Sequence, residues 1–505
     1  MTGSLYETMA AHWPDPSRLA LEAPGIGQWN YGELQDEVAR YAGVLVALGI
    51  AKGDRVVACV EKSPQALFLY LACLKAGFVF VPLNTAYRAA ELEYLIGNAG
   101  PALIVGDPAR EAELAALSAT GATPVRTLDA AGQGSLAKAA ETAAPMRKAD
   151  PCATADLAAI LYTSGTTGQP KGAMLSHGNL ASNGLTLRDA WAFTVRDRLL
   201  HALPIFHAHG LFVACHCALL AGAAMIWLPK FDGGEVCRHM PRATVFMGVP
   251  TFYTRLLAHE AFGAAQATHM RLFTSGSAPL LAETFEAFKA RTGQAILERY
   301  GMTETGMITS NPYEGERRAG TVGFPLPGVD IRIVDDSDSA GGAALPPGGI
   351  GGLQVKGPNV LSGYWRMPEK SAEEFTADGW FKTGDIARLD DQGYVHLVGR
   401  AKDLIISGGY NVYPKEIETL IDAQPEIEES AVIGVPHADF GEAAIAVVTV
   451  RPGAELDEAQ MIGRLKERLA NYKVPKRIFP VENLPRNAMG KVRKNLLRER
   501  YRDAL

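Results

Sequence analysis

Apolar runs of strand length alternate with amphipathic stretches of helix length from Leu19 to about Leu200. Arg55–Val60 has the pattern of a strand, Ser63–Ala76 that of a helix, and Val79–Pro82 that of the next strand. Such alternation favours parallel sheets, because each parallel connection needs a crossover that is usually a helix. A second alternating stretch covers Leu199 to Arg299. The sequence therefore predicts an α/β region with two helix-covered, parallel-type sheets.

The pattern changes twice in the second half of the chain. Gly and Pro become dense around Gly320 and short strands recur, which is typical of a small antiparallel, barrel-like subdomain over about 310–398. After Gly399 the pattern becomes that of a compact α+β unit of about 100 residues, large enough for its own core. A chain of 505 residues is too long for one core. We therefore predict an N-terminal domain over 1–399 and a mobile C-terminal domain over 400–505.

Composition excludes several classes of partner. With 48% apolar residues, 21% charged residues and a net charge of −6, the chain has no basic excess for nucleic acid or anionic membranes. The N-terminus carries Glu7 and Asp15 and no apolar core, so it does not have the pattern of a secretory signal. Leu211–Leu228 is uncharged, but Gly222 divides it into a helix-length and a strand-length piece, which predicts a buried helix followed by a core strand. Six sparse cysteines without zinc-site spacing fit reduced thiols. We expect a cytoplasmic protein.

A loop of small and hydroxyl residues follows the apolar strand Leu157–Tyr162. Its polar residues and glycines, with a lysine three residues beyond them, are Thr163, Ser164, Gly165, Thr166, Thr167, Gly168 and Lys171. Glycines let a backbone approach a ligand closely, and successive N–H groups in such a turn form an anion-binding concavity. The lysine adds a mobile positive charge. The sequence predicts a polyphosphate-binding loop, whose spacing does not fit the G-x-x-x-x-G-K-[ST] pattern.

The string SGTTGQPKG at 164–172 resembles the phosphate-binding signature of the adenylate-forming superfamily, which includes acyl-CoA synthetases, peptide-synthetase adenylation domains and luciferases. The resemblance covers nearly the whole chain, and the core motifs occur in the family's order. It implies an enzyme that uses ATP and Mg²⁺ to adenylate a carboxylic acid, and then transfers the acyl group to coenzyme A.

Further motifs extend the resemblance to the nucleotide, among them WFKTGD (380–385) and GR (399–400). In the family, the tyrosine of ERYGMTET (298–305) stacks on adenine and its glutamate helps to bind the metal, and SGSAPL (275–280) borders adenine and the acyl pocket. Magnesium prefers one or two carboxylates together with phosphates and water. An aspartate can accept hydrogen bonds from both ribose hydroxyls, and an arginine can donate to the same sugar. The expected nucleotide residues are Gly276, Ser277, Ala278, Tyr300, Gly301, Met302, Thr303, Asp385 and Arg400, with Glu304 for the metal.

The C-terminal part carries the family's remaining motifs. Lys402 falls at the hinge position, and the loop that turns toward the site for thioester formation includes Ser407, Gly408 and Gly409. Taken alone, Lys491 in PRNAMGK would be an exposed, inert lysine. In the family it stabilises charge that develops on the α-phosphate and carboxylate. It is also the position at which a lysine acetyltransferase would remove that charge and a deacetylase restore it.

Two arginines and a histidine indicate which class of carboxylic acid is the substrate. His207 lies in the family's acyl-pocket motif, PIFHAHGL, where we expect it to orient the substrate carboxylate. Arg299 precedes Tyr-Gly, where relatives that act on fatty or aromatic acids commonly have a small or neutral residue. Arg255 lies on the helix that walls the acyl pocket in the family. An unpaired charge in a closed pocket is costly, so the substrate should bring a countercharge.

A short dicarboxylate satisfies this requirement, because one carboxylate can react with ATP while guanidinium groups bind the other. We predict a malonate–CoA ligase that forms AMP and pyrophosphate, with methylmalonate as a second candidate substrate and Lys491, Glu304 and His207 as catalytic residues.

Three alternatives stay open. A medium-chain or aryl acyl-CoA synthetase would have Arg255 and Arg299 pointing outward. A stand-alone adenylation domain would usually show a pocket acid for an α-amino group, and the pocket motifs contain none. A non-catalytic, nucleotide-binding regulator would be expected to lack Lys491 or Glu304, and both are present.

Overall fold

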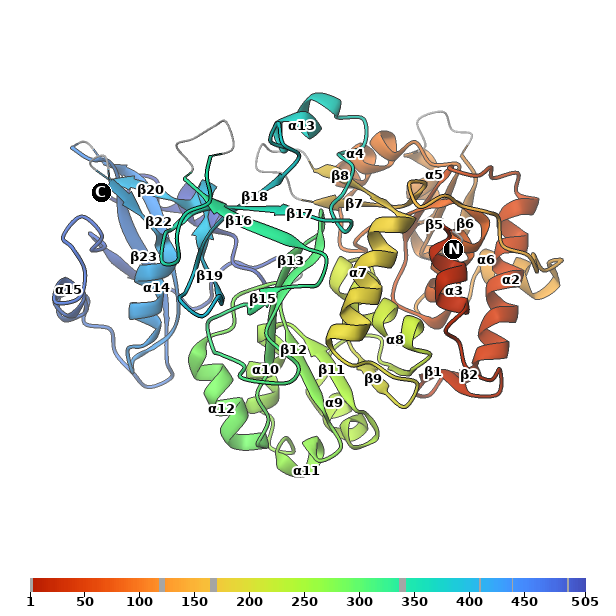
Figure 1. The fold of residues 1–505 in the computed structure, drawn as a ribbon, viewed down its shortest axis with the longest axis horizontal. Coiled ribbons are helices and arrows are strands. Elements are labelled where there is room, and N and C mark those ends of the chain that lie inside the picture. The colour runs from red at the N-terminus through yellow and green to blue at the C-terminus, as the bar shows by residue number, and fades with distance from the viewer. Residues whose placement is uncertain are drawn as a thin grey trace.

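The computed structural model of the chain describes residues 3–117, 123–163, 170–335, 342–407, 410–437, 439–487 and 490–505. These residues form four β-sheets, of nine, six, four and five strands. Figure 1 shows the two largest sheets in the part of the ribbon that runs from red to green, and the five-stranded sheet in the blue C-terminal part. Helices flank the two large sheets (Figure 1), as the alternating sequence pattern predicts.

The nine-stranded sheet is parallel through its centre and antiparallel at both edges. Its strands lie in the order β15 (Phe324–Pro325), β14 (Gly306–Ser310), β13 (Leu297–Met302), β12 (Leu272–Ser275), β11 (Val245–Gly248), β9 (Arg198–His201), β10 (Ala224–Trp227), β1 (Leu19–Ala23) and β2 (Gly27–Asn30). Parallel sheets need cover on both faces, and the central strands are accordingly almost wholly buried.

The six-stranded sheet is also mainly parallel, with an antiparallel pair at one edge only. Its strands lie in the order β6 (Val125–Thr127), β5 (Leu103–Gly106), β3 (Arg55–Cys59), β4 (Val79–Pro82), β7 (Leu157–Thr163) and β8 (Lys171–Ser176). The antiparallel hairpin of β7 and β8 flanks the predicted phosphate loop. The prediction of two helix-covered, parallel-type sheets is confirmed.

Helices connect the strands of these sheets and cover their faces. Their bounds are α1 (Leu5–Ala10), α2 (Tyr31–Ala47), α3 (Pro64–Ala76), α4 (Ala89–Ala99), η1 (Pro108–Arg110), α5 (Glu111–Ala116), α6 (Ser135–Thr142), α7 (His177–Ala190), η2 (His209–Cys215), α8 (His216–Ala221), α9 (Gly233–His239), η3 (Met240–Arg242), α10 (Pro250–Leu257), α11 (Ala264–Ala267) and α12 (Ala282–Thr292). Helix α3 shows how the sequence sets a boundary. The Ser63 hydroxyl accepts the Ala66 N–H at 3.2 Å, and Pro64 takes the first helical position, where its missing N–H has no intrahelical partner to lose.

The uncharged segment Leu211–Leu228 lies in the interior. Residues of η2 form a fully buried π-helical stretch that continues into α8, and β10 follows as a core strand. The prediction of a buried helix followed by a core strand is therefore confirmed. Among the described residues, no helix is long and apolar enough to cross a membrane.

The region predicted to be barrel-like forms an antiparallel sheet. Its strands lie in the order β16 (Asp330–Val334), β17 (Gly351–Lys356), β18 (Phe381–Leu389) and β19 (Val395–Arg400), and α13 (Pro368–Glu373) lies between β17 and β18 in the chain. Strands β16 and β19 are the edges of this sheet, so within the described ranges it is open where the sequence predicts a barrel-like closure.

The C-terminal unit has its own sheet and its own apolar clusters. The strands lie in the order β21 (Tyr410–Val412), β20 (Ile405–Ser407), β23 (Gly441–Val450) and β22 (Ile427–His437), and β24 (Ile478–Pro480) also pairs with β23. Its helices are α14 (Pro414–Asp422), α15 (Glu458–Lys466) and α16 (Lys494–Arg500). The change of sheet falls at η4 (Ala401–Asp403), where the sequence predicts the domain boundary. That this unit moves as a domain stays a prediction.

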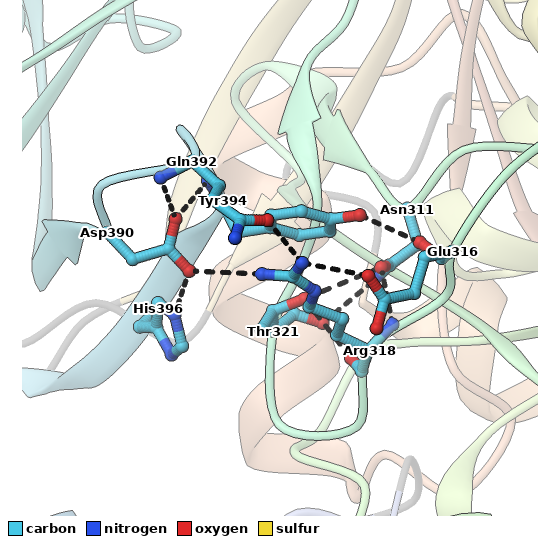
Figure 2. Close-up of polar contacts among 8 residues, drawn as sticks. All are labelled: Asn311, Glu316, Arg318, Thr321, Asp390, Gln392, Tyr394 and His396. Carbon is cyan, nitrogen blue, oxygen red and sulfur yellow. Dashed lines mark hydrogen bonds and ion pairs between the residues drawn. The ribbon is translucent and has the colours of Figure 1, made fainter.

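The loop after β14 is fixed to the β18–β19 hairpin by one cationic side chain. Figure 2 shows Arg318 between Glu316 and Asp390, with ion pairs of 2.8 and 3.7 Å. The guanidinium lies 4.2 Å from the centre of the Tyr394 ring, and the Tyr394 hydroxyl donates to the Glu316 carbonyl at 2.9 Å. Asp390 also contacts His396 at 3.1 Å. This network joins the nine-stranded sheet to the four-stranded sheet.

Two glycines near this junction, Gly323 and Gly328, allow a prediction about stability. Both have a left-handed backbone, but their surroundings differ. Their φ angles are 75° and 79°, and a Cβ at Gly323 would lie 2.0 Å from the Ser310 carbonyl oxygen, whereas no atom lies within 4 Å of one at Gly328. Gly328→Ala should lower the free energy of unfolding by about 1–2 kcal/mol, the cost of a left-handed alanine. Gly323→Ala should lower it by a further ~1–3 kcal/mol, because backbone must also shift. Equal thermal midpoints for the two variants would contradict this prediction.

Candidate active site

Three of the predicted nucleotide residues lie together where β13 meets β18 and β19. Arg400 Nε is 2.7 Å from Asp385 Oδ1, and the Tyr300 hydroxyl donates to the other oxygen of the same carboxylate. The register of β18 and β19 places Asp385 opposite Arg400. Burial raises the pKa of Tyr300 well above its usual value, so the phenol stays protonated and donates. Two sheets therefore contribute to one polar cluster.

Glu304 lies at the end of the predicted phosphate loop. Its Oε1 accepts from the Thr163 hydroxyl at 3.3 Å and from the Tyr364 hydroxyl at 3.1 Å. The carboxyl is buried, and burial raises its pKa. A cation bound beside Glu304 would lower that pKa again and favour the ionised carboxylate.

The donor set around Glu304 fits magnesium in a nucleotide site. Among the described residues, no group of three or more His, Cys, Asp or Glu side chains could hold a metal ion. A single carboxylate beside a hydroxyl is what Mg²⁺ uses when phosphates and water complete its octahedron. Glu304 and Thr163 are the residues that would hold it.

Lys171 begins β8 and is already paired. Its Nζ is 2.9 Å from Glu374 Oε1 and 4.2 Å from the centre of the Tyr364 ring, so Tyr364 contacts Lys171 with its face and Glu304 with its hydroxyl. The sequence analysis missed Tyr364 and Glu374, because no motif marks them in the segment after β17. The other loop residues named above, Ser164, Gly165, Thr166, Thr167 and Gly168, lie outside the described residues.

Arg299 is a buried cation with no ion-pair partner in the described part of the chain. It is 3% exposed, and its Nε and Nη2 have no hydrogen-bond partner among the described residues. A Cβ at Gly276 would lie 2.3 Å from Arg299 Nη1, so the glycine is required for the guanidinium to lie here. Burial lowers the pKa of Arg299 to about 10, which leaves it charged at neutral pH. Such a charge is costly until an anion pairs with it.

Two histidines lie beside this cation. His207 is half-buried, and its Nδ1 accepts the His209 N–H at 3.3 Å. Burial and then the Arg299 cation lower the pKa of His207 to about 4, so it is neutral at pH 7. His209 is buried, and its Nδ1 lies 3.3 Å from the Ser277 hydroxyl oxygen. The sequence analysis missed His209, although the second histidine of F-H-A-H-G was the signal for it.

A buried lysine fixes the segment that carries these histidines. Lys62 Nζ donates to His201 Nδ1 and to the His201 carbonyl, both at 2.8 Å, and His201 Nε2 donates to the Gly210 carbonyl at 2.9 Å. Lys62 follows β3 and His201 ends β9, so these bonds join the two large sheets. The start of η2 is thereby held in place.

A small pocket lies between this segment and the Tyr-Gly motif. Its lining includes Ala208 and Phe212 on one side and Thr303 and Gly306 on the other. Ala208 separates the two histidines, and Thr303 precedes the predicted metal ligand. Of the remaining predicted nucleotide residues, Gly301 and Met302 are half-buried at the end of β13, and Ala278 is half-buried in the turn after β12.

The prediction that Arg255 lines the acyl pocket is wrong. Arg255 is exposed on α10, whose buried side chains are Tyr253 and Leu256. A helix of eight residues can bury only one face, and the position before Leu256 points away from it. The pocket predicted to hold two cations therefore holds one, Arg299.

Lys491 belongs to the C-terminal unit but lies near Asp385 and Arg400. A Cβ at the preceding Gly490 would lie 3.2 Å from Thr251, so this loop packs against the start of α10. The surrounding protein and then the Arg400 cation lower the pKa of Lys491 to about 8, although much of the side chain stays accessible. Lys402 is exposed on η4.

The predicted CoA-side loop is described only at its start. Ser407 is buried at the end of β20, and Gly408 and Gly409 lie outside the described residues.

The lowered pKa of Lys491 predicts its chemical reactivity. Only the neutral amine reacts with an anhydride, so Lys491 should reach half of its maximal acylation near pH 8, whereas an ordinary lysine does so near about 10.4. Pulsed labelling with acetic anhydride across pH 6–11, read by mass spectrometry, measures this, and the exposed lysines of the same chain are the internal control. Arg400→Gln should move the Lys491 midpoint upward, because it removes a cation. A wild-type midpoint with the ordinary lysines would contradict the prediction.

The chain is similar to known proteins over nearly its whole length. The family model described as AMP-binding enzyme matches residues 7–365, and the model described as AMP-binding enzyme C-terminal domain matches residues 416–491. A solved structure of ATP-bound MatB from Rhodopseudomonas palustris is 54% identical, covers 100% of both chains and has a TM-score of 0.97. A feruloyl-CoA synthase from Amycolatopsis sp is 38% identical over 94% of both chains. A malonate–CoA ligase from Arabidopsis thaliana is 34% identical over 99% of this chain and 89% of that one.

Proposed function

This chain belongs to the AMP-binding enzyme family, and we propose that it forms malonyl-CoA from malonate, coenzyme A and ATP, with AMP and pyrophosphate as the other products. The observation that carries the proposal is the buried, unpaired guanidinium of Arg299. A dicarboxylate keeps one carboxylate for reaction and supplies the missing countercharge with the other. The likeness to ATP-bound MatB and to a malonate–CoA ligase supports the same substrate class, with methylmalonate as a second candidate.

An aryl acid fits this pocket less well. The feruloyl-CoA synthase among the relatives shows that the family accommodates aromatic acids elsewhere. An uncharged ring placed against Arg299 would leave a desolvated guanidinium with no partner, which is strongly unfavourable. The same cost applies to a medium-chain fatty acid.

The first proposed step is adenylation. A malonate oxygen attacks the α-phosphorus of ATP, the new P–O bond forms as the bond to the bridging oxygen breaks, and pyrophosphate leaves. Lys491 and Lys171 stabilise the negative charge that develops on the phosphate oxygens. A magnesium ion held by Glu304 and phosphate oxygens supplies further neutralisation when it is bound. Tyr300, Asp385 and Arg400 position the nucleoside, and His207 orients the reacting carboxylate.

The second proposed step is thioester formation. The thiolate of coenzyme A attacks the acyl carbon, a C–S bond forms, and AMP leaves with the carboxylate oxygen that carried it. The unit over 400–505 turns about Lys402 between the steps, which withdraws Lys491 and brings the segment after Ser407 to the site. Acetylation of Lys491 by a lysine acetyltransferase would remove its charge, and a deacetylase would restore it. A cytoplasmic location belongs to the same proposal.

The first test compares Arg299→Met with Arg255→Met. Loss of the buried cation should lower kcat/KM for malonate by about 100-fold or more, the size seen when one partner of a buried charge pair is removed. Arg255→Met is the matched control, because it removes the same charge from an exposed position on α10 and should leave malonate turnover close to wild type.

The assay is CoA-dependent AMP release with malonate, succinate, acetate, octanoate and ferulate. Wild-type preference for octanoate or ferulate over malonate would overturn the proposed function. Undiminished malonate turnover in Arg299→Met would contradict the proposed role of Arg299 in binding the second carboxylate.

The role of Lys491 is tested by separating the two steps. Lys491→Ala should slow malonate-dependent pyrophosphate exchange by about 100- to 1,000-fold, as expected for a lost electrostatic contact in the transition state. Thioester formation from supplied malonyl-AMP should stay near the wild-type rate, because Lys491 has left the site by then. Lys476→Ala, which changes an exposed lysine of the same unit, is the control. Equal loss of both half-reactions would contradict this assignment.

A further inference from the structure

His209 is a buried histidine, and one of its two ring nitrogens has no hydrogen-bond partner among the described residues. The residue is 1% exposed at the start of η2, and its Nε2 is buried without a hydrogen-bond partner in the part of the chain that the structure describes. Its Nδ1 lies 3.3 Å from the Ser277 hydroxyl oxygen. Buried polar groups are normally hydrogen-bonded, so an orphan nitrogen beside a ligand pocket indicates a partner that arrives with the ligand.

Ser277 is held in an unusual backbone conformation next to this nitrogen. Its φ of 71° is left-handed, which is uncommon for a residue other than glycine and is often found at functional sites. The preceding residue, Gly276, is the one against which the Arg299 guanidinium packs. Two adjacent residues of one turn thus contact His209 and Arg299, which places the imidazole and the guanidinium in the same buried region.

The electrostatics of His209 and Arg299 favour a neutral imidazole beside a charged guanidinium. Burial, and then the charge of Arg299, lower the pKa of His209 far below its usual value. A neutral imidazole has one N–H. If Ser277 donates its hydroxyl proton to Nδ1, the imidazole proton is on Nε2, the nitrogen that lacks a partner. Arg299 contributes two further unpartnered groups, Nε and Nη2.

We infer that the remote carboxylate of the substrate accepts a hydrogen bond from His209 Nε2–H as well as from Arg299, and that Ser277 holds His209 in the tautomer this requires. The inference rests on the proposed function, because only an acid with a second carboxylate can occupy this position. His209 is then a specificity-determining residue. It binds the anion without a second buried positive charge, and so favours a dicarboxylate over a monocarboxylate of similar length.

The test uses two substitutions that differ in where they place a donor. The side-chain amide of His209→Gln can reach the position of Nε2, whereas that of His209→Asn reaches only the position of Nδ1. His209→Asn should lower kcat/KM for malonate by about 10- to 100-fold, mainly through KM, which corresponds to one lost hydrogen bond to a charged group. Turnover of propanoate should stay unchanged. His209→Gln should recover much of the malonate activity, and Ser277→Ala should give a smaller loss in the same direction.

The matched control is His216→Asn. His216 is also fully buried, directly follows η2, and has one ring nitrogen, Nδ1, without a partner among the described residues. Its Nε2, however, bonds to the Tyr70 hydroxyl at 2.7 Å, and burial alone lowers its pKa, so it does not lie beside the Arg299 cation. The ratio of malonate to propanoate turnover should therefore not change. Should His209→Asn fail to fold, as judged by its thermal midpoint, His209→Gln and Ser277→Ala still provide the comparison.

The outcomes are distinguishable. An unchanged malonate-to-propanoate ratio in folded His209→Asn, or an equal fall of that ratio in His216→Asn, would overturn the role of His209 and leave the proposed function standing. A wild-type enzyme that releases no AMP with malonate would instead overturn the proposed function itself.

Discussion

The charge on Arg299 is the constraint on which the rest of the site depends. Parallel pairing of β12 with β13 brings Ser275 opposite Glu298, and the next residues, Gly276 and Arg299, then lie side by side. The guanidinium is buried at a place where a side chain on residue 276 would exclude it. Burial, and then this charge, lower the pKa values of both nearby histidines, so neutral imidazoles lie beside the cation. The buried positive charge of such a site is balanced only when an anion binds beside it.

The proposed nucleotide residues come from three sheets, and this explains why they lie so far apart in the chain. The nine-stranded sheet provides Tyr300, the four-stranded sheet provides Asp385 and Arg400, and the six-stranded sheet provides the ends of the phosphate loop. The Arg318 network in Figure 2 and the Lys62–His201 contact each join two elements of this assembly away from the reacting groups. Relative placement of the sheets, more than any single strand, therefore sets the geometry of the site.

Local sequence patterns predict much of the fold but only part of the candidate site. Strands such as β4 and helices such as α3 follow from short-range periodicity and capping, so the sequence predicts them closely. Tyr364 and Glu374 reach Lys171 through tertiary packing that no local pattern encodes. Arg255 was misplaced because a motif identifies a helix without saying which of its faces is buried. The predicted barrel-like region is an open sheet for a related reason, since closure depends on which edge strands meet.

The ion pair between Lys171 and Glu374 would compete with a phosphate for the lysine at the proposed phosphate site. Any triphosphate that engages the ammonium group must first displace a carboxylate from it, so part of the attraction for the incoming anion is already offset. Free energies of this kind are reciprocal. At the proposed site, release of Glu374 would therefore raise nucleotide affinity, and a ligand bound at Lys171 would weaken the contact that holds the segment next to α13. Small anions, which form few contacts, would then be disfavoured relative to a triphosphate.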